Sequence, residues 1–141
     1  TTSMAGSSEK ADGSSFMRLC RSISGYYAGK KKIAMTTPVF MNEGEEKTMS
    51  FVLPKKVIAE GVPSGNDRLV SVGSLASGRY AVVRLRGSRS DVKVADGKRA
   101  LASWIAGQGF RSVGDYLVAG YDPPFTPGFA QRNEVLVRLA D

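Results

Sequence analysis

The chain contains no histidine, and this absence removes many common kinds of functional site. Without imidazole there is no Ser-His or Cys-His nucleophile pair, no histidine acid or base, and no His-ligated zinc or copper. The sequence also lacks GxSxG and GxGxxG motifs, and no two carboxylates have a spacing that suggests acid and base roles. We therefore assign no catalytic residue and no metal ligand, and favour a binding protein over an enzyme.

Cysteine and long apolar runs are also scarce. The single cysteine, Cys20, cannot form an internal disulfide or a multi-cysteine metal site, so a reduced compartment such as the cytoplasm or a plastid is favoured. No apolar run approaches the roughly 20 residues of a membrane span, and the first residues have no signal-peptide core. We expect no integral membrane association. Because the chain begins with Thr1 instead of methionine, a removed targeting segment stays possible.

Acidic residues are outnumbered by basic ones, 13 against 20, which gives a net charge of +7. This balance favours an anionic partner: nucleic acid, anionic lipid, or a small molecule that carries carboxylates or phosphates. Nucleic acid is the least favoured of these, because only Lys30, Lys31 and Lys32 form a dense basic run. The aromatic residues do not alternate with the charges as a base-stacking surface would require.

The first half of the chain predicts a loop, a helix and a hairpin. Residues 1–15 are rich in Ser, Gly and Thr and are expected to form a loop. Four residues at i, i+3, i+4 and i+7 then predict a short amphipathic helix: Phe16, Leu19, Cys20 and Ile23. Residues 33–41 and 48–53 are rich in strand formers, and the polar residues between them predict a hairpin turn. Residues 54–67 read as a connector.

The second half predicts a strand, a helix and two further strands. After an expected strand at 68–75, residues 79–87 alternate, with Ala81, Val83 and Leu85 on one face. A second amphipathic helix follows, with core residues Val94, Leu101, Trp104 and Ile105, and with Gly97 on the same stripe. A glycine there predicts close packing on a sheet. Two more strands are expected at 115–121 and 134–140.

The loop between the last two strands, DPPFTPGFAQRN, is expected to have a structural role. Asp122 precedes two prolines and reads as a turn former. Glu134 follows Arg132 closely, which predicts a local ion pair. We expect Phe125 and Phe129 to plug the end of the sheet.

The two halves are similar in element order, which indicates a duplicated unit within a single domain, residues 1–141. The first half lacks the opening strand that the second half has. We therefore expect that this strand would lie before Thr1, with TTSMA as its tail, and that the chain is processed or truncated there.

Three segments together resemble the SOUL haem-binding protein family: KIAMTTPVFM, then MSFVLP, then GYDPPFTPGFAQRNEVLV. FMRL at the start of the first helix and LRG at 85–87 extend the resemblance over nearly the whole chain. The resemblance implies an α+β fold, in which a twisted antiparallel sheet or distorted barrel of two similar halves is flanked by two helices. It also implies haem or a related tetrapyrrole as the ligand, bound in a shallow apolar groove beside the first helix.

The same resemblance implies the residues of that groove. Phe16 and Cys20 would contact the macrocycle, with Leu19 and Ile23 beside them, and Arg21 would face a propionate. An arginine fork suits a carboxylate. The helical spacing of Phe16, Leu19 and Ile23 predicts core residues first and a groove lining second.

Iron ligation by this chain is expected to be weak at most. Some relatives are thought to use a histidine, which is absent here. The remaining candidates are Cys20, a methionine (Met17 or Met35) and a tyrosine (Tyr26 or Tyr27). Metal-free tetrapyrroles should then bind about as well as haem.

Two alternatives to a tetrapyrrole carrier or buffer remain open at this point. One is an enzyme that removes the metal from a tetrapyrrole or helps to break it down. The other is a generic module for binding small molecules or protein partners, since similar folds serve unrelated functions.

Overall fold

A computed structural model of the protein describes residues 2–6, 37–45, 48–60, 71–122 and 125–141. Its contacts divide the chain into two compact units. One comprises Thr1–Met41 and Glu46–Ala76, and the other comprises Asn42–Glu45 and Ser77–Asp141. That residues 1–141 form one domain stays a prediction.

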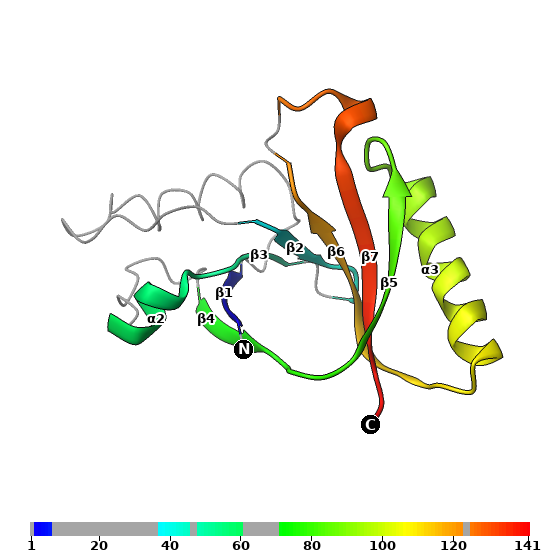
Figure 1. Ribbon diagram of the computed structural model, residues 1–141, viewed down its shortest axis with the longest axis horizontal. Helices are drawn as coiled ribbons and strands as arrows, with labels where there is room; N and C mark the ends of the chain where they lie inside the picture. The colour runs from blue at the N-terminus through cyan, green and yellow to red at the C-terminus, as the bar shows by residue number, and fades with distance from the viewer. Residues whose placement is uncertain (1, 7–36, 46–47, 61–70, 123–124) are drawn as a thin grey trace. The chain divides into compact units, whose positions relative to one another are not determined.

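The first unit contains a hairpin, a short helix and a pair of strands (Figure 1). The hairpin joins β2 (Val39–Asn42) and β3 (Met49–Phe51), with Val39 opposite Phe51, as the sequence predicted. The helix is α2 (Lys55–Glu60), and the strand pair is β1 (Thr2–Gly6) with β4 (Ser71–Leu75), which run antiparallel. Met41, Met49, Phe51 and Leu53 are buried.

Two of these elements differ from the sequence prediction. Residues 2–6, expected to be loop, form β1, with Thr2 opposite Leu75. Residues 55–60, expected to be connector, form α2. In both cases the segment is short, so neither periodicity nor composition gives a clear signal. In β1, the pairing with β4 supplies backbone hydrogen bonds that composition cannot reveal.

The second unit contains three strands and a long helix. Its elements are β5 (Tyr80–Arg86), α3 (Asp91–Gly107), β6 (Ser112–Gly120), the 3₁₀ turn η1 (Gly128–Ala130) and β7 (Arg132–Leu139). β7 pairs antiparallel with both β5 and β6, so that Val137 lies opposite Ala81 and Val135 opposite Val118. These three valines, Val118, Val135 and Val137, are fully buried.

Helix α3 runs alongside β5 and β7 (Figure 1), and its inward stripe is Val94, Gly97, Leu101 and Ile105. A Cβ built on Gly97 would lie 3.0 Å from Leu85 Cδ2 and 3.1 Å from Val135 Cγ2. The predicted close packing at Gly97 is therefore confirmed. Trp104, predicted as a core residue, is instead 50% exposed. It lies on the flank of the stripe, and helical spacing alone does not fix how wide the buried face is.

Within the second unit, the strand order is β6-β7-β5. β5 and β6 do not pair with each other, so these three strands form an open sheet instead of a closed barrel. The predicted α+β fold, an antiparallel sheet with a helix packed on it, is confirmed. The first of the two predicted helices, at residues 16–23, lies outside the described residues.

Candidate functional site

Tyr121, Arg132 and Glu134 form one contact network where β6 ends and β7 begins. The Tyr121 hydroxyl donates a hydrogen bond to Glu134 Oε2 at 2.9 Å. Arg132 donates two hydrogen bonds to Glu134 Oε1, from Nη2 at 2.7 Å and from Nε at 3.1 Å. The guanidinium carbon of Arg132 lies 4.6 Å from the centre of the Tyr121 ring, a cation–π geometry. The predicted local ion pair of Glu134 is confirmed.

The loop between these residues is closed by further hydrogen bonds. A carboxylate oxygen of Asp122 accepts a hydrogen bond from the Arg132 backbone N–H. Gln131 Nε2 donates to the carbonyl of Thr126 at 2.9 Å. The buried Asn133 donates through Nδ2 to the carbonyl of Gly87 at 3.4 Å. The loop is thus tied to β7 and to the turn after β5.

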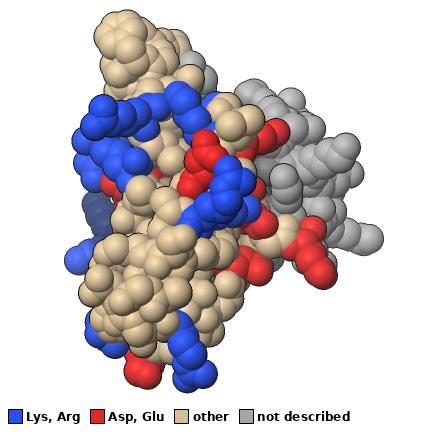
Figure 2. Space-filling model, turned by 90° about the vertical axis from the view of Figure 1, so that its right-hand side faces the viewer, with Lys and Arg blue, Asp and Glu red and all other residues tan. Residues whose placement is uncertain are grey.

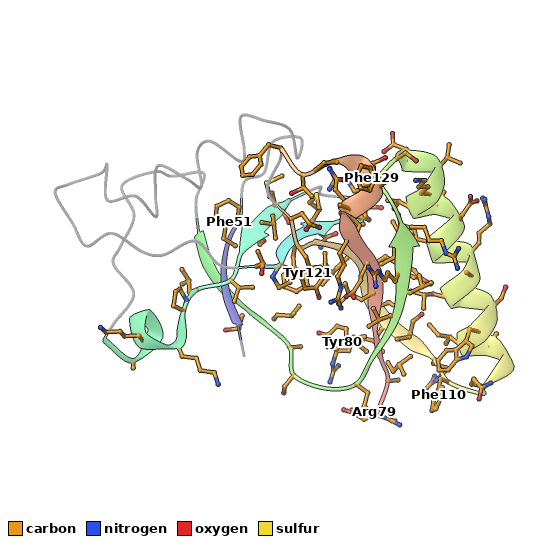
Figure 3. The ribbon with its side chains drawn as sticks, turned by 45° about the horizontal axis from the view of Figure 1, so that its top comes forward. Phe51, Arg79, Tyr80, Phe110, Tyr121 and Phe129 are labelled. Atoms are coloured by element: carbon orange, nitrogen blue, oxygen red, sulfur yellow. The ribbon has the colours of Figure 1, made fainter. Side chains whose placement is uncertain are left out.

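The two phenylalanines of this loop do not plug the sheet. Phe125 is 87% exposed and Phe129 is 89% exposed. Figure 3 shows Phe129 at the end of β7, away from the sheet interior. The prediction was wrong because the loop is already closed by polar contacts.

The pKa shifts in this network indicate that its side chains hold one another in place. Burial, and then the hydrogen bond to Glu134, raise the pKa of the Tyr121 phenol above its ordinary value. Glu134 likewise raises the pKa of the Arg132 guanidinium, which stays charged. At neutral pH, Tyr121 is therefore a donor, and both oxygens of Glu134 are engaged. These groups hold each other and leave no base free.

A second feature of this unit is a pocket of about 380 Å³ between α3 and β5. Its lining comes from four consecutive strand residues and three helix residues: Tyr80, Ala81, Val82, Val83, Ala100, Leu101 and Trp104. The lining side chains are apolar except for the Tyr80 hydroxyl and the Trp104 indole N–H. Trp104 and Val82 are each 50% exposed, so the pocket opens to solvent beside them.

A stack of aromatic and cationic groups continues from this pocket. The Trp104 and Phe110 rings are stacked, with centroids 6.1 Å apart. The guanidinium carbon of Arg79 lies 5.4 Å from the Phe110 centroid. Figure 3 shows Arg79 and Phe110 together at the end of the unit where α3 finishes and β5 begins. Sequence reasoning did not single out Arg79 or Phe110 as functional residues. The available signal for an apolar surface was the uncharged run 100–110, which is followed by a basic residue.

The predicted groove residues, Phe16, Leu19, Cys20, Arg21 and Ile23, lie outside the described residues. So do the candidate iron ligands Met17, Met35, Tyr26 and Tyr27. Their roles stay predictions.

Within the described ranges, no three side chains of Cys, Asp or Glu are grouped so that they could hold a metal ion. This part of the chain therefore supplies no such ligand set for iron. No helix of the described part has the length and apolar character needed to cross a membrane.

The fold and the contact network place this chain among α+β proteins with a helix packed on an antiparallel sheet. Its sequence matches the SOUL heme-binding protein family over residues 1–138, and the chain belongs to this family. The described network of Tyr121, Arg132 and Glu134 comes from the YDPP and RNE segments that carried the resemblance. A comparison with curated proteins found no match.

One similar solved structure is the crystal structure of a hydrolase from Listeria innocua, with a TM-score of 0.61. The alignment covers 99% of this chain and 88% of that chain, at 10% sequence identity. At this identity the likeness shows a shared fold and nothing about activity.

Proposed function

We propose that this protein binds haem or a related tetrapyrrole in a shallow apolar groove beside the first helix and acts as a carrier or buffer. The observation that carries this proposal is the family match over residues 1–138, which includes residues 16–23, where the first helix is predicted. The net charge of +7 adds support, because tetrapyrroles such as haem carry two carboxylates.

In this proposal, apolar side chains contact the faces of the ligand's ring, and an arginine pairs with a propionate at its edge. Phe16 and Cys20, with Leu19 and Ile23, contact the macrocycle, and Arg21 pairs with a propionate. Haem would bring an iron able to take axial ligands, but the chain offers no imidazole for it. The proposal therefore depends on apolar contact and on ion pairing, both of which a metal-free ring also provides.

Parallel absorbance titrations of the protein with haem and with metal-free protoporphyrin test this proposal. We expect a saturable shift of the Soret band with both ligands and dissociation constants within a few fold of each other. The absence of saturable binding by either ligand would contradict the proposal. Binding of haem alone would show that an iron ligand dominates and would contradict the proposed mode of binding.

The same titration addresses the enzyme alternative. The spectrum of a carrier complex should stay constant over hours in the dark. A steady loss of the pigment's absorbance, at a rate proportional to protein concentration, would show turnover and replace the carrier proposal.

A further inference from the structure

The pocket between α3 and β5 has no role in the proposed function, which uses the first helix. All the described residues that line the pocket lie in the second unit. Its aromatic wall, Trp104, is half-exposed, and such an exposed ring is a flat surface for an incoming ring. The residues that line this pocket are therefore different from those of the proposed groove.

The helix residues that line this pocket come from an uncharged stretch of α3. Residues 100–110, the second half of α3 and the turn after it, contain no charged residue. Residues 91–99 contain five, among them Lys98 and Arg99. Figure 2, which views this side of the molecule, shows an uncharged area below a band of Lys and Arg side chains. The apolar part of a ligand can therefore bind against this stretch of α3 without desolvating a charged group on it.

Arg79 supplies a positive charge at the edge of this apolar surface. It directly precedes Tyr80, a lining residue, and it reaches the pocket wall through the Phe110 and Trp104 rings. A guanidinium that rests its face on a ring keeps its in-plane N–H donors available for an anion. In the part of the chain that the structure describes, no carboxylate forms an ion pair with Arg79.

We propose that this pocket binds a small fused-ring aromatic carboxylate, with its rings against Trp104 and its carboxylate paired with Arg79. The volume of about 380 Å³ is near the lower end of the roughly 300–1,000 Å³ common for ligand pockets. It suits a few fused rings better than a tetrapyrrole macrocycle. The arrangement of an apolar body and one cation matches an amphipathic monoanion.

Trp104 is the only tryptophan in the chain, so its indole N–H gives one signal that reports on this pocket. The experiment follows the Trp104 indole cross-peak in ¹H–¹⁵N correlation spectra while 2-naphthoate is added. We expect a saturable shift of this peak, and a weaker affinity for neutral 2-naphthamide by about fivefold at low salt. An unshifted peak, or equal affinity for the two compounds, would overturn the proposal.

Two pairs of variants locate the binding. Ala100→Leu places a larger side chain in the pocket lining and should abolish the shift, whereas Ala102→Leu, on the same helix outside the lining, should not. Arg79→Gln should weaken 2-naphthoate about fivefold and leave 2-naphthamide unchanged, while Arg86→Gln, at the other end of β5, serves as the charge control. Equal effects within either pair would overturn the proposal.

Two further measurements distinguish this pocket from the proposed groove and from a contact between two copies of the chain. The haem titration of the Ala100→Leu variant should match that of the unchanged protein, because the proposed groove is made of other residues. Loss of haem binding in this variant, with its fold retained, would assign the pocket to the tetrapyrrole and overturn the second site. A shift of the Trp104 peak with protein concentration alone would show that a second copy covers the pocket, which also overturns it.

Discussion

Glu134 accepts hydrogen bonds from two side chains, one just after the end of β6 and the other at the start of β7. Tyr121 uses one carboxylate oxygen and Arg132 the other. The YDPP and RNE segments, which are separated by the loop in sequence, therefore form a single network in space. This network gives a physical reason for the presence of Tyr121, which sequence reasoning could connect with Arg132 and Glu134 only through a family resemblance.

Replacing Tyr121 with Phe should lower the free energy of unfolding by about 1–2 kcal/mol at neutral pH, because the hydrogen bond is to a charged carboxylate. Burial and Glu134 raise the pKa of the folded-state phenol. The stabilisation is thus fully present below the pKa of an unfolded tyrosine, near 10, and is lost as the pH rises through the higher folded value. Urea unfolding from pH 7 to 11 measures this.

The control for this experiment is Tyr116→Phe on β6, the strand that ends just before Tyr121, which should show little change at either pH. If Tyr121→Phe has the same stability as the unchanged protein at pH 7, the hydroxyl contributes nothing and the network is incidental.

Replacing Arg21 with Ala should weaken tetrapyrrole binding by about 0.5–1.5 kcal/mol, since solvent screens an ion pair near the surface. Esterifying the propionates should produce a similar loss in the unchanged protein and little further loss in the variant. Absorbance titrations at low salt measure both. Equal affinity of the variant and the unchanged protein for the free acid would show that Arg21 does not face a propionate.

At the scale of elements, α3 shows what a helical pattern can and cannot predict. The stripe from Val94 to Ile105 was predicted, and so was the close approach at Gly97, because both depend only on spacing along one helix. The exposure of Trp104 was not predicted, because it depends on how far β5 extends beneath the helix. That distance is a property of the tertiary structure.

Replacing Gly97 with Leu should destabilise the protein by about 1–3 kcal/mol, because the added atoms have no space against Leu85 and Val135. Gly107→Ala, where a Cβ meets nothing within 4 Å, should leave the stability unchanged or slightly raise it. Thermal unfolding measures both. Equal stability of the two variants would show that α3 does not pack closely on Leu85 and Val135.

Replacing Trp104 with Ala should cost about 1–2 kcal/mol, less than the about 3–5 kcal/mol typical of a buried tryptophan, because half of its surface is exposed. The comparison is Ile105→Ala, which removes a buried side chain and should cost about 2–5 kcal/mol. Urea unfolding gives both values. A larger loss for Trp104 than for Ile105 would contradict the half-exposed position of the indole.

For the whole molecule, the family resemblance predicted the α+β fold, and the strand and helix patterns of residues 79–139 agreed with it in detail. Composition could not reveal β1, whose existence depends on pairing with β4, more than sixty residues away. Nor could it reveal the pocket, because Tyr80 and Trp104 meet only after α3 folds back on β5. Local sequence patterns do not predict contacts between segments that are distant in the sequence.

The net charge of +7 also acts on the whole molecule. The association rate of an anionic tetrapyrrole should fall as salt rises from about 0.01 to 0.15 M, because the Debye length shrinks from about 30 to 8 Å. The dimethyl ester should associate at a rate that hardly depends on salt. Stopped-flow absorbance measures both rates, and equal salt dependence would show that charge does not steer the ligand.

The position of β7 between β5 and β6 has a consequence for how the second unit folds. β5 and β6 each pair with β7, which is the last of the three in the sequence. The β5–β7 ladder must therefore close a long chain segment that includes the whole of α3, whereas the β6–β7 hairpin closes only a short one. We expect the hairpin to form early and β5 to dock late, so that side-chain deletions in β5 mainly accelerate unfolding.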